Sequence, residues 1–244
     1  AIPKVIEGGD LLAAAQTGTG KTAGFTLPIL HRLLNNPQQN RKPGRPRALI
    51  LAPTRELAAQ VEESVRLYSQ HTRLRSMVMF GGVNINPQFH ALRKPLDILV
   101  ATPGRLLDHV RQRTVDLTGV EILVLDEADR MVDMGFHDDI VAIASHCPPR
   151  RQTLLFSATY PENIRKLSAR FLKNPAEVKV EALHDASQIE QIFYEVHPEQ
   201  RLSAVVTLLE HFRPASTLIF CNTKMRCQEV VEELQSEGIQ ALAL

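Results

Sequence analysis

A phosphate-binding-loop pattern at residues 15–22 constrains the fold of this chain more than any other feature. It lies between a short apolar run, residues 11–15, and a helical pattern that starts near Lys21. A strand, a glycine-rich turn and a helix in this order bring backbone N–H groups and a helix N-terminus around phosphate oxygens. The pattern therefore predicts a nucleotide site on an α/β sheet, formed by Ala15, Gln16, Thr17, Gly18, Thr19, Gly20, Lys21 and Thr22.

Two residues of the loop have distinct predicted roles. Lys21 can reach the β- and γ-phosphates, and the Thr22 hydroxyl can hold Mg²⁺. Ala15 stands where many such loops have glycine, but a small residue is compatible with the tight turn. Because a Gly-Lys-Thr run can also arise by chance in a loop, a nucleotide site needs support from a second motif.

The second motif is the acidic tetrad Asp-Glu-Ala-Asp at 126–129. It follows an apolar run, residues 120–125, that suits a buried parallel strand, and ligands bind at the carboxyl ends of such strands. There, Asp126 can hold Mg²⁺ and Glu127 can orient and deprotonate an attacking water. The alternative is that these acids only occupy a solvated helix N-terminus. Together the two motifs favour a nucleotide triphosphatase core, with Glu127 and Lys21 as catalytic residues.

The tetrad resembles the one that gives DEAD-box RNA helicases their name. Further segments resemble motifs of that family in the same order: 53–58 (Pro-Thr-Arg-Glu-Leu-Ala), 81–82 (Gly-Gly), 102–105 (Thr-Pro-Gly-Arg), 157–159 (Ser-Ala-Thr) and 218–223 (Leu-Ile-Phe-Cys-Asn-Thr). Residues 1 to about 135 are most similar to the bacterial RhlE type, and residues 138–244 are more similar to the DbpA type. The resemblance implies ATP as substrate, Mg²⁺ as cofactor and RNA as partner, and it leaves the subfamily, or a mosaic of the two, open.

The resemblance also implies roles for residues outside the nucleotide loop. It assigns RNA binding, mainly to the sugar–phosphate backbone with weak sequence preference, to Thr54, Arg55, Gly82, Thr102, Gly104 and Arg105. It assigns coupling between the nucleotide and RNA sites to Asp129, Ser157 and Thr159. The local alternative is that these residues form turns and helix caps, with Ser157 and Thr159 capping the helix that follows.

Apolar strands and amphipathic helices alternate along the chain, which predicts βαβ crossovers and a mostly parallel sheet. The strands are expected at 11–15, 48–52, 76–80, 97–101, 121–125, 152–157 and 176–180. With the resemblance, this predicts an α/β, RecA-like parallel sheet with helices on both faces over residues 1–181. Residues 35–47 read as a surface loop, and Pro28 is expected to kink the first long helix or end its regular part.

After a linker at 182–190, residues 191–244 are expected to form the N-terminal part of an incomplete second RecA-like domain. Its predicted strands are 191–196, 217–220 and 239–242, and its predicted helices are 199–212 and 224–237. The family's adenine-reading motif and its arginine-finger motif fall outside the chain as given. We therefore expect residues 1–244 alone to be nearly inactive.

Composition limits the expected partners and cellular location of the protein. No apolar run approaches the roughly 18 residues of a membrane helix, so we expect no membrane partner. The three cysteines lack metal-site spacing and favour small core positions in a reducing cytoplasm. Because the net charge is only +1, RNA must contact a local surface, and the aromatic fraction of 5% argues against a base-stacking platform.

Two functions compete on this evidence. The first is an ATP-dependent RNA helicase that binds, bends and locally unwinds or remodels RNA. The second is a nucleotide-gated RNA clamp or RNA chaperone with little unwinding, in which hydrolysis only sets the residence time. The intact Glu127 favours the first, since a clamp does not need the base. A GTPase switch or a small-molecule kinase would leave 53–58 and 102–105 unexplained. The RNA target stays open, with ribosomal RNA or a ribonucleoprotein among the candidates.

Overall fold

The computed structural model describes residues 1–15, 18–38, 41–179 and 190–243. They fall into two units, one on each side of residues 180–189, and each unit is described by itself. The linker predicted at 182–190 lies almost entirely outside the described residues.

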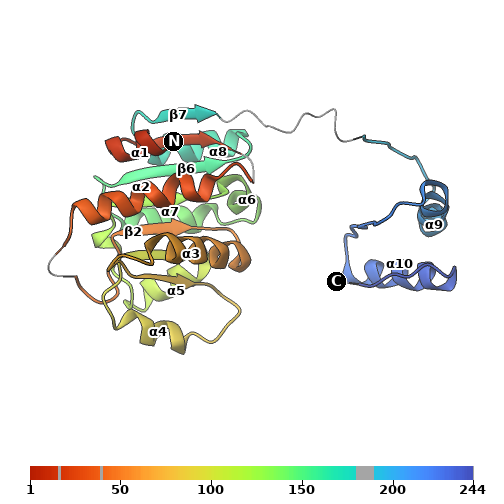
Figure 1. Ribbon diagram of the computed structural model, residues 1–244, viewed down its shortest axis with the longest axis horizontal. Coiled ribbons are helices and arrows are strands. Elements are labelled where there is room, and N and C mark those ends of the chain that lie inside the picture. Colours follow the sequence, from red (N-terminus) through yellow and green to blue (C-terminus); the bar gives the residue numbers. More distant parts are fainter. Residues whose placement is uncertain (16–17, 39–40, 180–189, 244) are drawn as a thin grey trace. The chain divides into compact units, whose positions relative to one another are not determined.

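The first unit is built on a seven-stranded parallel sheet with the order β3-β4-β2-β5-β6-β1-β7. Its strands are β1 (Leu11–Ala14), β2 (Ala48–Leu51), β3 (Ser76–Met79), β4 (Ile98–Ala101), β5 (Ile122–Leu125), β6 (Gln152–Ser157) and β7 (Ala176–Lys179). They confirm the seven strands expected from the apolar runs, with ends that differ by no more than a residue among the described positions (Figure 1).

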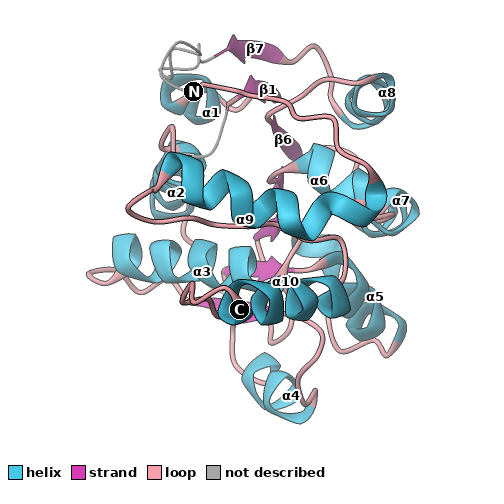
Figure 2. Ribbon diagram, turned by 90° about the vertical axis from the view of Figure 1, so that its right-hand side faces the viewer, coloured by secondary structure: helices cyan, strands magenta, loops and turns pink. Residues whose placement is uncertain are grey.

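Helices cover both faces of this sheet, as predicted (Figure 2). One face carries α1 (Ile2–Glu7), α2 (Lys21–Asn35) and α3 (Arg55–Ser69). The other carries α5 (Pro103–Arg111), α6 (Ala128–Asp133), α7 (His137–His146) and α8 (Glu162–Phe171). The short helix α4 (Asn86–Leu92) and the 3₁₀ turn η1 (Leu117–Gly119) lie in the connections.

The apolar side chains of the strands alternate between the two layers. In β2, Leu49 and Leu51 pack into the core beneath α5–α8, whereas Ile50 packs into the core beneath α1–α3. In β5, Leu123 packs into the core beneath α5–α8 and Val124 packs into the core beneath α1–α3. Since strand side chains point to opposite faces in turn, a sheet covered on both faces needs continuous apolar strands. Each fully buried Leu or Ile stabilises the fold by about 1.5–3 kcal/mol.

The parallel strands give the sheet two chemically different edges. All strands end at one edge, which we call the carboxyl edge, and all begin at the other, which we call the amino edge. Ala15 follows β1 and Asp126 follows β5, so the two motifs found in the sequence meet at the carboxyl edge. This is where open α/β sheets bind ligands.

The proline in α2 does not end that helix. The helix runs from Lys21 to Asn35 with Pro28 inside it, so the prediction that Pro28 ends the regular helix is wrong. Proline removes one helical N–H, but Ile29, Leu30 and Leu33 bury their side chains beyond it. Tertiary packing of this apolar face offsets the lost hydrogen bond.

In the second unit, the structure contains α9 (Arg201–Phe212), α10 (Lys224–Ser236) and the 3₁₀ turn η3 (Pro198–Gln200). Val206, Val230 and Leu234 form its small core, which agrees with the helical stripes in the sequence. The strands predicted at 191–196, 217–220 and 239–242 are wrong, because residues 190–243 contain no strand. A strand exists only where a neighbouring strand accepts its backbone hydrogen bonds, and these segments have no such neighbour.

Candidate nucleotide and RNA site

The phosphate loop joins β1 to α2 at the carboxyl edge. Gly18 and Gly20 have φ values of 83° and 80°, a left-handed conformation that glycine adopts without strain. The N-cap residue of α2 is Gly20, which makes no side-chain capping bond, and the N–H groups of a first helical turn can bind an anion. The N–H of Ala15 donates to the carbonyl of Ser157, which ties the start of the loop to β6. Gln16 and Thr17 lie outside the described residues.

Lys21 lies between the two acidic residues that follow β5. Its Nζ is 3.8 Å from Oδ1 of Asp126 and 3.7 Å from Oε1 of Glu127, and only 7% of its side chain is exposed. These contacts are too long for hydrogen bonds and act through charge alone. A nucleotide phosphate would therefore find a buried cation that no carboxylate holds tightly.

Asp126 is almost completely buried, with 2% of its side chain exposed. Burial raises the pKa of this carboxyl to about 6; the charge of Glu127 also raises it, and Lys21 opposes the rise. Its Oδ1 has no hydrogen-bond partner among the described residues. The carboxylate therefore does not belong to a solvated helix N-terminus.

The residues at this point fit Mg²⁺. The ion prefers oxygen ligands and takes one or two protein ligands beside substrate phosphates and water. Asp126 offers an unpartnered buried oxygen, and Thr22 lies in the first turn of α2. No group of three or more His, Cys, Asp or Glu side chains suited to a metal is found in the described chain.

Glu127 occupies a strained backbone position. Its φ of 51° and ψ of 54° are left-handed, which is uncommon for a residue with a side chain, and it forms the N-cap position of α6. Its Oε2 is 3.4 Å from Nη1 of Arg130, and its Oε1 faces Lys21. Cations thus flank the carboxylate on both sides.

Asp129 connects α6 to the segment after β6. The N–H and the Oγ1 of Thr159 both donate to Oδ2 of Asp129 at 2.9 Å, and Ser157 Oγ donates to the carbonyl of Thr159 at 2.7 Å. Burial tends to raise the pKa of Asp129, but the hydrogen bonds from Thr159 outweigh it and the pKa is lowered. The N-cap of α8 is Pro161, without a side-chain bond, so Ser157 and Thr159 do not cap that helix.

The residues with a predicted RNA role all follow strands at the carboxyl edge. Thr54 caps α3, because its Oγ1 accepts a hydrogen bond from the N–H of Leu57. Thr102 precedes α5 without a capping bond from its side chain. Gly104 has no other atom within 4 Å of the place where a Cβ would stand, and Gly82 has a φ of 76°. The local alternative therefore holds for Thr54. Gly104 leaves open space where a side chain would stand, whereas Nη1 of Arg55 lies 3.6 Å from the corresponding place at Gly82.

The two arginines of this set differ in exposure. Arg55 is exposed over 59% of its side chain and pairs with Glu56 at 2.5 Å. Arg105 is exposed over only 12%, and its Nη2 donates to the carbonyl of Val83 at 3.1 Å. Arg105 therefore holds the loop that follows β3, and Arg55 is the more accessible cation.

Two nearby residues escaped the motif-based reading. Arg130 pairs with Glu127, and the i, i+3 spacing within the tetrad's helix is the signal that could have revealed it. The Tyr160 hydroxyl is buried without a hydrogen-bond partner in the described part of the chain. Burial, followed by the charges of Asp129 and Glu177, raises its pKa. Nothing in the local sequence indicates this burial.

A RecA-like sheet with a phosphate loop and an Asp-Glu pair at the end of a central strand defines the class of P-loop nucleotide triphosphatases. Residues 1–167 match the family described as DEAD/DEAH box helicase, and the chain belongs to this family. No helix in the described residues is long and apolar enough to cross a membrane.

Similar proteins agree with this assignment. The chain is 44% identical over 241 residues to the ATP-dependent RNA helicase CshA of Listeria monocytogenes, covering 98% of this chain and 45% of the relative. It is 42% identical to the DEAD-box ATP-dependent RNA helicase CshA of Geobacillus kaustophilus, covering 98% and 50%. The chain thus spans about half the length of these curated relatives. The RhlE-type and DbpA-type leanings of its two parts are not confirmed.

A solved structure supports the fold. The crystal structure of a DEAD box protein from the hyperthermophile Methanococcus jannaschii superimposes with a TM-score of 0.66 at 35% sequence identity. The match covers 100% of this chain and 64% of that chain.

Proposed function

We propose that the full-length protein is an ATP-dependent RNA helicase, which uses ATP binding and hydrolysis to bind, bend and locally unwind RNA. The observation that carries this proposal is the cluster of Lys21, Asp126 and Glu127 at the carboxyl edge. The Lys21 ammonium lies within 4 Å of a carboxylate oxygen of each acid. The printed names of the CshA relatives, ATP-dependent RNA helicases, support the same function.

The nucleotide chemistry follows from the roles of the individual side chains. The N–H groups of the loop and Nζ of Lys21 bind and orient the β- and γ-phosphates. Mg²⁺ held by Thr22 and Asp126 would neutralise charge on these phosphates when bound. A carboxylate oxygen of Glu127 accepts a proton from the attacking water, and this requires the orientation that the strained backbone and Arg130 support.

RNA contact and coupling are the second half of the proposal. Thr54, Arg55, Gly82, Thr102, Gly104 and Arg105 bind phosphate and sugar groups of RNA along the carboxyl edge. The hydrogen bonds between Thr159 and Asp129 transmit the state of the nucleotide to that surface. The proposal includes ribosomal RNA or a ribonucleoprotein as the target. It also includes a cytoplasmic location, where ATP and RNA meet.

A nucleotide-gated clamp is the second candidate. It would bind RNA in an ATP-dependent manner without separating strands. The cations on both sides of Glu127 favour the helicase, because repeated turnover depends on an oriented base more than the slow release of RNA from a clamp does.

The test is a pair of measurements on the full-length protein: phosphate release with and without single-stranded RNA, and displacement of a short RNA strand from a duplex. We expect RNA to stimulate phosphate release and ATP to drive displacement. Stimulated hydrolysis without displacement would identify the clamp. A rate of ATP hydrolysis that does not change when RNA is added would contradict both candidates.

A further inference from the structure

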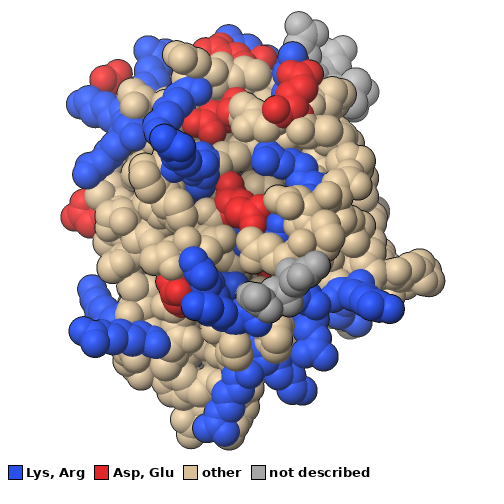
Figure 3. Space-filling model, turned by 90° about the vertical axis from the view of Figure 1, so that its left-hand side faces the viewer, with Lys and Arg blue, Asp and Glu red and all other residues tan. Residues whose placement is uncertain are grey.

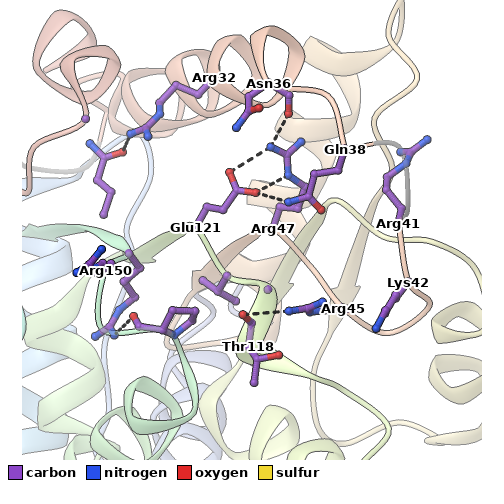
Figure 4. A pocket seen from close by; sticks show the side chains of 16 residues that line it. Arg32, Asn36, Gln38, Arg41, Lys42, Arg45, Arg47, Thr118, Glu121 and Arg150 are labelled. Atoms are coloured by element: carbon purple, nitrogen blue, oxygen red, sulfur yellow. Dashed lines mark hydrogen bonds and ion pairs between the residues drawn. The ribbon is translucent and has the colours of Figure 1, made fainter.

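A second site of concentrated charge lies at the amino edge, away from the nucleotide loop. A cavity of about 540 Å³ opens there between the end of α2, the loop before β2, η1 and the segment between α7 and β6 (Figure 4). On this side of the first unit, Lys and Arg side chains surround a hollow in the surface (Figure 3). Arg47 stands directly before β2 and Gln152 begins β6, so the starts of central strands form the floor.

The lining of this cavity is strongly basic. Of its sixteen residues, seven are Arg or Lys and one, Glu121, is acidic. Five of the cations come from α2 and the loop that follows it: Arg32, Arg41, Lys42, Arg45 and Arg47. The other two, Arg150 and Arg151, come from the segment before β6. We call these seven side chains and the cavity between them the basic pocket.

Carboxylates compensate only part of this charge. Three of the seven cations have an acidic partner: Arg41 with Asp97 at 2.6 Å, Arg45 with Asp116 at 3.4 Å and Arg47 with Glu121 at 2.7 Å. Two hydrogen bonds from Arg47, at 2.7 and 3.1 Å, neutralise the one acid in the lining, so it does not repel an anion. Four cations remain without an ion pair among the described residues.

These four cations are placed to receive a ligand. Lys42 and Arg150 are exposed and lie on opposite sides of the cavity (Figure 4). Arg151 donates from Nη1 to the carbonyl of Pro148, but its Nε is buried and has no partner in the described structure. The Arg32 guanidinium donates to the neutral side chain of Gln152, its one side-chain partner in the described part of the chain. Lys42 forms no ion pair but lies within electrostatic reach of Asp116. Like charges gathered with few counter-charges are costly unless an anion compensates them.

The lining selects phosphate over other parts of a nucleic acid. It contains no aromatic side chain on which a base could stack. Guanidinium groups match phosphate oxygens in geometry, and cations on two sides of an opening suit a row of phosphates better than a single one. We propose that the basic pocket binds the sugar–phosphate backbone of single-stranded RNA, as a second RNA site independent of the one at the carboxyl edge. Inorganic polyphosphate carries the same recognition chemistry.

The salt dependence of RNA affinity tests this site directly. Each cation that neutralises a phosphate of a single strand contributes about 0.7 to the slope of log affinity against log salt. In the chain carrying Arg55→Ala and Arg105→Ala, the further double change Lys42→Ala with Arg150→Ala should lower the slope for a 12-nucleotide oligouridine by about 1.4. The affinity loss should be about sevenfold larger at 50 mM than at 200 mM salt. Inorganic tripolyphosphate should compete for the same binding.

A matched control is the double change Arg165→Ala with Lys166→Ala, which removes two exposed cations from α8. It should leave the slope unchanged. Charge reversal, Lys42→Glu with Arg150→Glu, should remove the residual RNA binding while far-ultraviolet circular dichroism stays the same, because both side chains are exposed.

The arms of the experiment separate this site from the proposed function. If Arg55→Ala with Arg105→Ala has no effect while the pocket variants do, the RNA face at the carboxyl edge is wrong and the basic pocket stands. An unchanged slope in the pocket variants overturns the proposal. Competition by polyglutamate but not by tripolyphosphate also overturns it, because the pocket would then serve an acidic protein segment.

Discussion

The two edges of one sheet carry opposite electrostatic arrangements. At the carboxyl edge, the Lys21 side chain faces buried Asp126 and half-buried Glu127, so cation and anions share a small space. At the amino edge, the basic pocket holds seven cations, and only three of them are paired with carboxylates. Mixed charges in a buried space suit chemistry on a phosphate, where a cation, a metal ligand and a base are all needed. A surplus of one sign suits binding without chemistry.

The largest effect expected from this contrast is a loss of ATP turnover when the catalytic carboxylate at the carboxyl edge is removed. Glu127→Gln should lower RNA-stimulated ATP turnover by about 10²–10⁴-fold, since it removes the group that takes the proton from water. ATP and RNA affinities should stay nearly unchanged. The control is Asp133→Asn, an exposed acid on the same helix. Equal turnover in wild type and Glu127→Gln would remove the catalytic role of this residue.

A second prediction compares ATP binding at the carboxyl edge with tripolyphosphate binding at the amino edge. Lys21→Ala should weaken ATP binding by about 10- to 100-fold, the scale of a lost hydrogen bond between charged groups. Tripolyphosphate binding at the basic pocket, measured by calorimetry without Mg²⁺, should not change. Lys4→Ala removes a lysine from the exposed surface of α1 and serves as the control. If Lys21→Ala weakened the binding of both ATP and tripolyphosphate, the two ligands would share one phosphate site.

A third prediction uses the pKa of Asp126, which burial raises to about 6. Mg²⁺ needs the ionised carboxylate, so binding must release a proton whenever the pH is below this value. The Mg²⁺-dependent part of nucleotide affinity should fall about tenfold between pH 7.5 and pH 5.

Asp126→Asn provides the comparison for this pH effect. Its affinity should be lower at pH 7.5 and should lack the part of the pH dependence that Asp126 contributes. RNA binding by the basic pocket should show no corresponding change between these pH values, because arginine and lysine stay charged. An identical pH profile in Asp126→Asn would assign the titration to another group.

The smallest expected effect concerns Arg55, the exposed arginine of the carboxyl edge. Arg55→Ala should weaken binding of all single-stranded RNAs alike, and the loss should shrink by about threefold between 50 and 200 mM salt. Lys42→Ala should have a similar effect at the other edge, so the two changes should combine additively if the sites are independent. Loss confined to one RNA sequence would show that Arg55 contacts bases.

Local signals predicted much of the fold and the nucleotide site. Apolar runs located central strands such as β2, β4 and β5, because strands covered on both faces are apolar throughout. The strand β7 was located although Glu177 and Lys179 are exposed. Apolar runs failed at 191–196, 217–220 and 239–242, where the same kind of run has no neighbouring strand. Of the two effects expected of Pro28, a kink or an end of the regular helix, the end is wrong, because the packing of α2 offsets the lost hydrogen bond.

The sequence by itself determined the phosphate loop, the acidic tetrad and their order, because each is a contiguous motif with its own backbone chemistry. Only the tertiary structure decided how deeply Asp126 is buried, which cations hold Glu127 and that Arg105 supports a loop more than it faces solvent. It alone assembled the basic pocket, since Lys42 and Arg150 are distant in the chain and meet where central strands begin. Burial and the meeting of distant charges depend on the strand order of the sheet, and no local run of residues encodes that order.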